Sequence, residues 1–165
     1  MRYRVPAVAT ILLTLLVSTR LGFAKGTPDK IVISGGGLRH PVEITDSLTR
    51  FQFNPWTGRF AEWQQALAVS PSQCGTTPYD VRFYMRWPGR RTKYDLGDLT
   101  LIYDLTYCRD ARMGAGWIHL PGPGEPLYPV NGATIVRHGQ DGQSFPASSE
   151  WSARFAELIG FRSQQ

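Results

Sequence analysis

The sequence predicts an α+β fold with one mostly antiparallel sheet of about six strands, one helix after the first hairpin and one C-terminal helix. Residues 79–87 and 99–107 alternate apolar and polar side chains, as strands with one buried face do. Glycine, proline and asparagine separate several short apolar segments, which is typical of turns between strands. Two further segments repeat their apolar residues at helical spacing.

The first predicted element is a hairpin of two strands, residues 30–34 and 41–45, whose connection contains Gly35, Gly36 and Gly37. A glycine-rich loop after a strand can also bind phosphate, but that loop leads into a helix whose N-terminal amides face the anion. Here a second strand follows, and no Gly-Lys-Ser/Thr is present. We therefore interpret the glycines as a bend, where they supply positive φ angles.

Two helices are predicted from apolar residues that recur every three or four positions. Asp46 is the predicted N-cap of a short turn after the hairpin, and a helix is predicted over residues 57–67. The C-terminal helix is predicted to begin at Ser148 or Ser149 and to end at Gly160. The apolar faces consist of Trp56, Phe60, Trp63 and Leu67 in the first helix and Trp151, Phe155, Leu158 and Ile159 in the second. Such aromatic rows are more typical of a buried helix face than of a sugar-binding platform.

The two alternating strands also predict an ion pair. Asp104 lies on the face opposite the apolar row of its strand. It is therefore expected to pair across strands with Arg82 or Arg86.

A short strand is predicted at residues 116–120, and the proline–glycine segment 121–126 follows it as a sharp connection. Residues 127–130 and 133–137 flank Asn131-Gly132, which predicts a hairpin with a type I′ turn. An alternative role for segment 121–126 is a rigid recognition loop of an inhibitor or envelope-stabilising protein.

The N-terminus has the three parts of a secretory signal. Residues 1–4 are basic, residues 5–18 are mainly apolar, and the small residues Gly22 and Ala24 stand where a signal peptidase cleaves. We expect cleavage after Ala24, which leaves residues 25–165 as a single exported domain. The apolar segment is shorter than the ~20 residues of a membrane-spanning helix. An uncleaved membrane anchor is the alternative.

Removal of the signal would also change the net charge. It takes away three arginines and no acid, so 15 basic and 13 acidic residues remain, a net of +2 instead of +5. Nucleic-acid binding needs concentrated positive charge, so nucleic acid is not an expected partner. The expected location is the periplasm or the outside of a bacterial cell.

Cys74 and Cys108 both lie in the exported part, where thiols are normally oxidised. We predict a disulfide between them that closes a loop of about 35 residues and contributes roughly 3–4 kcal/mol. Metal binding is the alternative, but a zinc site takes four ligands at short spacings and no Cys-x-x-Cys is present. No metal and no cofactor are therefore expected.

No catalytic motif such as Gly-x-Ser-x-Gly is present, so no catalytic residue is assigned. The alternative is a small secreted hydrolase in which His119 works with a nearby carboxylate, for example Asp104 on the neighbouring strand. Its nucleophile is not identified, since nothing around Ser34 or Ser144 suggests activation. The plainer interpretation of His119 is a solvated or hydrogen-bonded strand histidine.

The densest basic segment offers a possible ligand surface. Its members are Arg82, Tyr84, Arg86, Arg90 and Arg91. Arginines interleaved with tyrosine can bind an anionic glycan. The plainer interpretation is a solvated strand face, because Asp80, Asp95 and Asp98 partly neutralise the positive charge.

Four short motifs resemble a group of small secreted bacterial proteins without assigned function. They are Ile31-Val-Ile-Ser-Gly-Gly-Gly-Leu38, Pro41-Val-Glu-Ile-Thr-Asp46, Asn54-Pro-Trp-Thr-Gly-Arg-Phe60 and Leu120-Pro-Gly-Pro-Gly124. The resemblance spans most of the exported part, and it implies export and one compact domain but no catalytic residue. We expect a non-enzymatic binding or protein-interaction domain of the bacterial cell envelope. Its partner would be an envelope protein or an anionic glycan.

Overall fold

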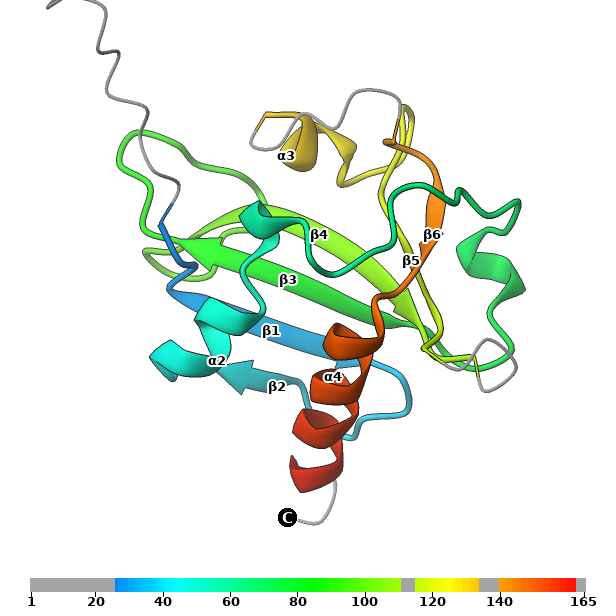
Figure 1. Cartoon of the computed structure of the whole chain (residues 1–165). Helices are drawn as coiled ribbons and strands as arrows, with labels where there is room; N and C mark the ends of the chain where they lie inside the picture. Colours follow the sequence, from blue (N-terminus) through cyan, green and yellow to red (C-terminus); the bar gives the residue numbers. More distant parts are fainter. Residues whose placement is uncertain (1–25, 111–114, 134–139, 163–165) are drawn as a thin grey trace, which may run out of the picture.

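The computed structural model describes residues 26–110, 115–133 and 140–162, and these form one antiparallel sheet with helices packed on it (Figure 1). The strands are β1 (Lys30–Gly35), β2 (Val42–Ile44), β3 (Tyr79–Met85), β4 (Thr100–Cys108), β5 (Trp117–His119) and β6 (Ser144–Pro146). The helices are α2 (Ser47–Gln52), α3 (Tyr128–Gly132) and α4 (Ser149–Arg162). The sheet order is β2-β1-β3-β4-β5-β6, which confirms the predicted α+β fold.

The first hairpin is as predicted, with β1 and β2 antiparallel. Ile31 of β1 lies opposite Ile44 of β2, and on its other side it lies opposite Phe83 of β3. All three side chains are buried. Asp46 caps α2 as predicted, because its Oδ1 accepts a hydrogen bond from the Thr49 N–H at 2.8 Å.

The main core lies between the sheet and α4. Trp151 and Phe155 of α4 pack against Tyr107 of β4, with ring centroids 5.0 and 4.7 Å from the tyrosine ring. Phe53, which follows α2, packs edge-on against Trp151 at 5.5 Å. The short helix α2 itself contributes no buried residue to this core.

The prediction of a helix over residues 57–67 is wrong. Only a 3₁₀ turn, Pro55–Thr57, forms there, and Gly58 ends it in the left-handed region at φ 68°. The chain then runs beside β6, where the N–H of Glu62 and of Leu67 donate to the carbonyls of Pro146 and Ser144. These backbone bonds to a strand edge replace the bonds that a helix would make. Phe60 is still buried as expected, while Trp63 is partly buried.

The hairpin predicted over residues 127–137 is also wrong in its described part, because α3 occupies Tyr128–Gly132. Residues 134–139 lie outside the described residues. The Asn131 side chain is buried, and it accepts from the Asp104 N–H at 2.8 Å and donates to the Asp104 carbonyl at 2.7 Å. Asn131 thus binds the backbone N–H and carbonyl of Asp104, in the part of β4 that extends beyond β5, and does not form a turn. The last strand of the sheet is β6 instead.

The C-terminal helix starts as predicted, since the Trp151 N–H donates to Ser148 Oγ at 3.3 Å. It does not end at Gly160 but continues to Arg162, because no positive φ angle at Gly160 stops it.

The predicted disulfide between Cys74 and Cys108 is present, with 5.7 Å between the two Cα atoms. It ties the segment after the 3₁₀ turn Pro71–Gln73 to the last residue of β4. The predicted signal, residues 1–24, lies outside the described residues. Among the helices of the described part, none is long and apolar enough to cross a membrane.

Candidate functional site

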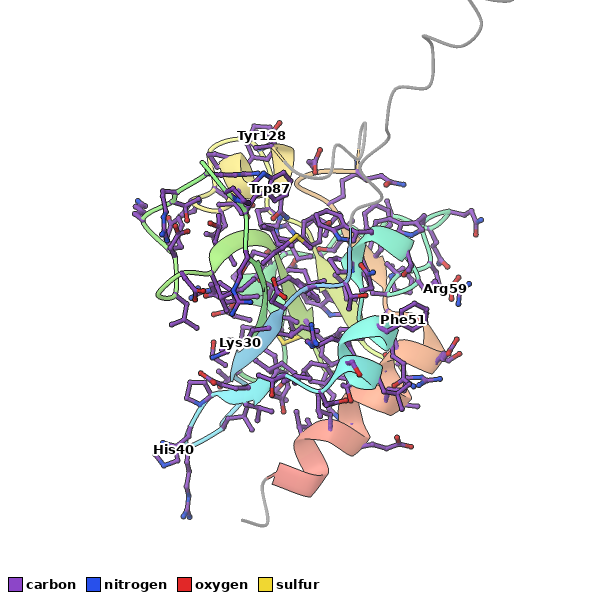
Figure 2. All side chains as sticks on the ribbon, turned by 90° about the vertical axis from the view of Figure 1, so that its left-hand side faces the viewer. Lys30, His40, Phe51, Arg59, Trp87 and Tyr128 are labelled. Atoms are coloured by element: carbon purple, nitrogen blue, oxygen red, sulfur yellow. A yellow bond between two sulfur atoms is a disulfide. The ribbon has the colours of Figure 1, made fainter. Side chains whose placement is uncertain are left out.

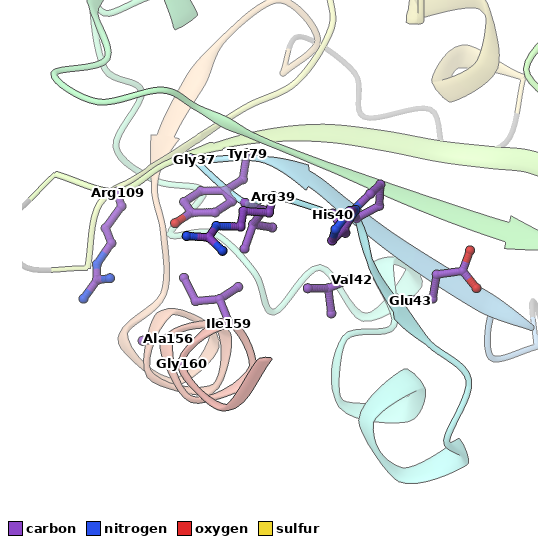
Figure 3. Close-up of a pocket in the computed structure, with 13 residues that line it drawn as sticks. Gly37, Arg39, His40, Val42, Glu43, Tyr79, Arg109, Ala156, Ile159 and Gly160 are labelled. Atoms are coloured by element: carbon purple, nitrogen blue, oxygen red, sulfur yellow. The ribbon is translucent and has the colours of Figure 1, made fainter. Parts of the chain in front are cut away.

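A cavity of about 640 Å³ lies between the β1–β2 connection and the C-terminal half of α4. Figure 3 shows its lining, with Tyr79 of β3 between Arg39 and Arg109 and with Ile159 of α4 on the opposite wall. We refer to this cavity as the hairpin pocket. It is large enough for a small organic ligand.

Gly36 and Gly37 line one wall of the hairpin pocket, directly after Gly35. Gly35, Gly36 and Gly37 all have positive φ angles, 79°, 60° and 80°. Gly36 also lies against the ring of Tyr79, where a Cβ atom would come within 1.8 Å of Cε1. The sequence Gly-Gly-Gly is therefore a bend, as predicted, and β2 follows it rather than a helix. The bend gives the Tyr79 ring a backbone wall that only glycine permits.

The floor of the hairpin pocket is apolar and its rim is basic. Tyr79, Val42 and Ile159 are each only 6–7% exposed. Arg39, His40 and Arg109 line the same cavity and are exposed. Such a combination provides an apolar surface for the body of a ligand and cations for its charged group.

The two arginines of the rim have no carboxylate partner in the described part of the chain. The one acidic residue that lines the pocket, Glu43, binds Lys30 instead, with 2.8 Å between Oε2 and Nζ. In Figure 3 Glu43 lies at the far end of the lining from Arg109. Arg39 and Arg109 are therefore available for a ligand anion.

The predicted basic surface is placed differently. Arg82 pairs with Asp104 at 3.3 Å, as expected from the strand pattern, and lies directly opposite it in the β3–β4 register. Arg86 pairs with Asp98 at 3.0 Å, and Arg91 with Asp95 at 3.7 Å. These intramolecular pairs occupy the guanidinium groups that a ligand would need.

The other two members of that surface also contact the chain. Arg90 stacks over the Trp87 ring at 5.4 Å and donates to the Val130 carbonyl at 3.4 Å. Tyr84 is 5% exposed, and burial raises the pKa of its hydroxyl. A ligand role for this surface remains a prediction, and the geometry favours the hairpin pocket.

Asp104 is a buried carboxyl group whose acid–base behaviour is strongly perturbed. It is 3% exposed, and burial raises the pKa of its carboxyl to about 7, although the Arg82 guanidinium acts in the opposite direction. It does not serve as the partner of His119, because His119 lies opposite Thr106 and is bonded elsewhere.

His119 is buried rather than solvated, and both ring nitrogens have partners. Nδ1 lies 3.1 Å from Ser144 Oγ, and Nε2 lies 3.2 Å from both carboxylate oxygens of Glu125. The Ser144 hydroxyl donates to the Val69 carbonyl at 2.7 Å, so it accepts from Nδ1. The nearby carboxylate is thus Glu125, not Asp104. The buried Ser144 hydroxyl, already committed to a carbonyl, is poorly placed as a nucleophile.

No family model, curated protein or solved structure matches this chain. Among the residues that the structure describes, no group of three His, Cys, Asp or Glu side chains could hold a metal ion. Functional interpretation therefore rests on the geometry of the pocket.

Sequence reasoning missed the hairpin pocket because its parts come from distant segments. Arg39 lies in the β1–β2 connection, while Arg109 follows the disulfide cysteine at the end of β4. One pattern was available: Leu38-Arg-His-Pro41 places two basic residues in an exposed connection directly after the glycines. Arg109 carries no comparable pattern.

Proposed function

We propose that this protein is an exported, non-enzymatic binding domain that takes an anionic ligand in the hairpin pocket. The observation that carries the proposal is the pair of exposed arginines, Arg39 and Arg109, over an apolar floor and without carboxylate partners in the described part of the chain. Guanidinium groups bind carboxylate and phosphate through paired hydrogen bonds, typically worth about 1.5–3 kcal/mol each.

The ligand that fits is an acidic sugar. A pyranose ring presents an apolar face that can lie on the apolar floor, and its carboxylate can reach an arginine of the rim. Val42 and Ile159 add apolar side chains to this floor. A bare phosphate ion would use the arginines but leave this apolar floor uncovered, so we expect it to bind more weakly.

The proposed location is the periplasm or the outside of a bacterial cell, which suits an acidic glycan as ligand. Support comes from the disulfide, which is typical of oxidising compartments, and from the secretory pattern of residues 1–24. Mass spectrometry of the protein expressed with its own N-terminus tests this. A mass for residues 25–165, two hydrogens short, is expected, and an uncut chain would contradict it.

The test of binding is calorimetric titration of the purified protein with digalacturonate, with a neutral disaccharide of the same size and with inorganic phosphate. Digalacturonate is expected to bind best. Arg39→Ala and Arg109→Ala should each weaken it by about tenfold, which corresponds to ~1.4 kcal/mol. Arg86→Ala removes the same charge from a site outside the pocket and serves as the control.

Two results would overturn the assignment to the hairpin pocket. Equal affinity for the neutral disaccharide would show that the arginines do not select the ligand. Loss of binding in Arg86→Ala but not in Arg39→Ala would place the ligand on the basic surface of β3 and the following turn.

A further inference from the structure

Helix α2 turns its large apolar side chains toward the solvent. Leu48 is 68% exposed and Phe51 is 65% exposed, and they lie three positions apart on one side of the helix. The helix has no buried residue, because Phe53, just after it, anchors the segment to the core instead. Leaving such side chains in water forgoes the favourable free energy of burying them. Among the described residues the other large exposed apolar side chain is Leu96, at 40%.

A second cavity, of about 320 Å³, lies beside these two side chains. We call it the α2 groove. Leu48 and Phe51 form one side, Arg59 and the first turns of α4 form the other, and the buried ring of Trp151 lies at the bottom. Figure 2 shows Phe51 and Arg59 extending on the same side of the molecule. The groove shares no residue with the hairpin pocket, since it lies at the opposite end of α4.

The charge at the α2 groove is positive. Arg154 is paired with Glu150 at 3.0 Å within α4. Arg59 is exposed, and its guanidinium has no salt-bridge partner in the described ranges. The groove therefore offers two apolar contacts beside one available cation.

We propose that the α2 groove docks an extended segment of a partner protein in which a large apolar side chain stands close to an aspartate or glutamate. The apolar side chain would lie between Leu48 and Phe51, and the carboxylate would bind Arg59. Charge complementarity favours this occupant over a second copy of the chain. A symmetric pair would bring the same basic groove of both copies face to face, so that Arg59 would meet like charge.

The test is selection from a displayed library of random twelve-residue peptides on the purified, exported protein. Peptides that combine Leu, Phe or Trp with Asp or Glu two to four positions away are expected to be enriched. A synthetic peptide of that consensus is then titrated into the protein. Phe51→Ser, Leu48→Ser and Arg59→Glu should each weaken its binding by at least about tenfold, as loss of a central contact does.

Leu96→Ser is the matched control, because it removes an exposed leucine outside the groove and should leave peptide affinity unchanged. The indole N–H of Trp151 provides a direct reporter, since its Nε1 is buried with no acceptor among the described residues. Its NMR resonance, assigned with Trp151→Phe, should shift when the peptide binds.

Three outcomes would overturn the proposal. The first is a library that yields no acidic–apolar consensus, and the second is binding of the selected peptides to Phe51→Ser as tightly as to the wild type. The third is a dimer in sedimentation that Phe51→Ser abolishes, which would assign the groove to self-association. Digalacturonate titrations of the same variants keep this test separate from that of the hairpin pocket.

Discussion

Gly36 lies so close to the ring of Tyr79 that a Cβ atom on residue 36 would fall 1.8 Å from the tyrosine Cε1. Tyr79 in turn packs on Tyr107 and Phe155, with centroids 6.2 and 5.1 Å away. The tyrosine therefore cannot move aside without disturbing the core. This contact connects the floor of the hairpin pocket to the packing of α4 on the sheet.

Gly36→Ala is expected to destabilise the protein by roughly 2–4 kcal/mol, because it adds overpacking against Tyr79 to the strain of a positive φ angle. Gly37→Ala is the control, since Gly37 has φ 80° but nothing within 4 Å of its Cβ position. It should cost about 1 kcal/mol from strain alone. Urea unfolding measures both, and equal losses would show that the Tyr79 contact is not tight.

The raised pKa of Asp104 leads us to expect that stability depends on pH. Its folded-state pKa of about 7 lies above its usual value of 3.8 because the group is buried. The folded state then binds the proton more tightly than the unfolded state, so this group makes stability fall as pH rises from about 4 to 7. Asp104→Asn cannot ionise. The wild type should therefore lose stability relative to this variant across that window, as measured by urea midpoints at a series of pH values.

Asp98→Asn provides the contrast to Asp104→Asn. Asp98 is exposed, and its hydrogen bond from Arg86 lowers the pKa of its carboxyl. Its contribution is therefore lost as pH falls, the opposite direction, and it is small because solvent screens the pair. Identical pH profiles for the wild type and Asp104→Asn would contradict the raised pKa of Asp104.

Local patterns were sufficient for much of this fold. The alternation of β3 and β4 and the pairing of Arg82 with Asp104 follow from period-two strands, and the disulfide follows from two cysteines in an exported chain. Segment 57–67 has helical periodicity, but its backbone instead pairs with the edge of the sheet at and just after β6. This pairing forms only once the tertiary fold has brought the two segments together. β6 itself is three residues long and contains Pro146, too little for a strand pattern.

The candidate site was less accessible to sequence reasoning for the same physical reason. Asn131-Gly132 is a strong local turn signal, yet Asn131 instead bonds the Asp104 backbone, 27 positions away. Arg39 and Arg109 are 70 positions apart in the chain, and they line one cavity because the sheet register sets Gly35, Tyr79 and Tyr107 side by side at one end of the sheet. Contacts of this range leave no periodic pattern in the sequence.

His119→Ala is expected to lower stability by about 1–3 kcal/mol, since it removes a buried ring that is bonded to Ser144 and Glu125. Glu125→Gln should cost less, because the Glu125 side chain is 46% exposed. Thermal unfolding of the two variants measures this difference. A hydrolytic activity that disappears in His119→Ala while stability stays unchanged would instead support the hydrolase alternative.

The disulfide is expected to contribute roughly 3–4 kcal/mol, because it closes a loop with a sequence separation of 34 residues and so restricts the unfolded chain. In the folded state Cys108 is fully buried at the end of β4. The segment that carries Cys74 is also joined to this end of the strand by the hydrogen bond from Thr76 Oγ1 to the Arg109 carbonyl at 3.3 Å. The variant with both Cys74→Ser and Cys108→Ser should therefore unfold at lower denaturant concentration, and dithiothreitol should bring the wild type to the same midpoint. Because Arg109 follows Cys108 directly, the same variant should also bind digalacturonate more weakly. An unchanged unfolding midpoint would show that the disulfide adds nothing to stability.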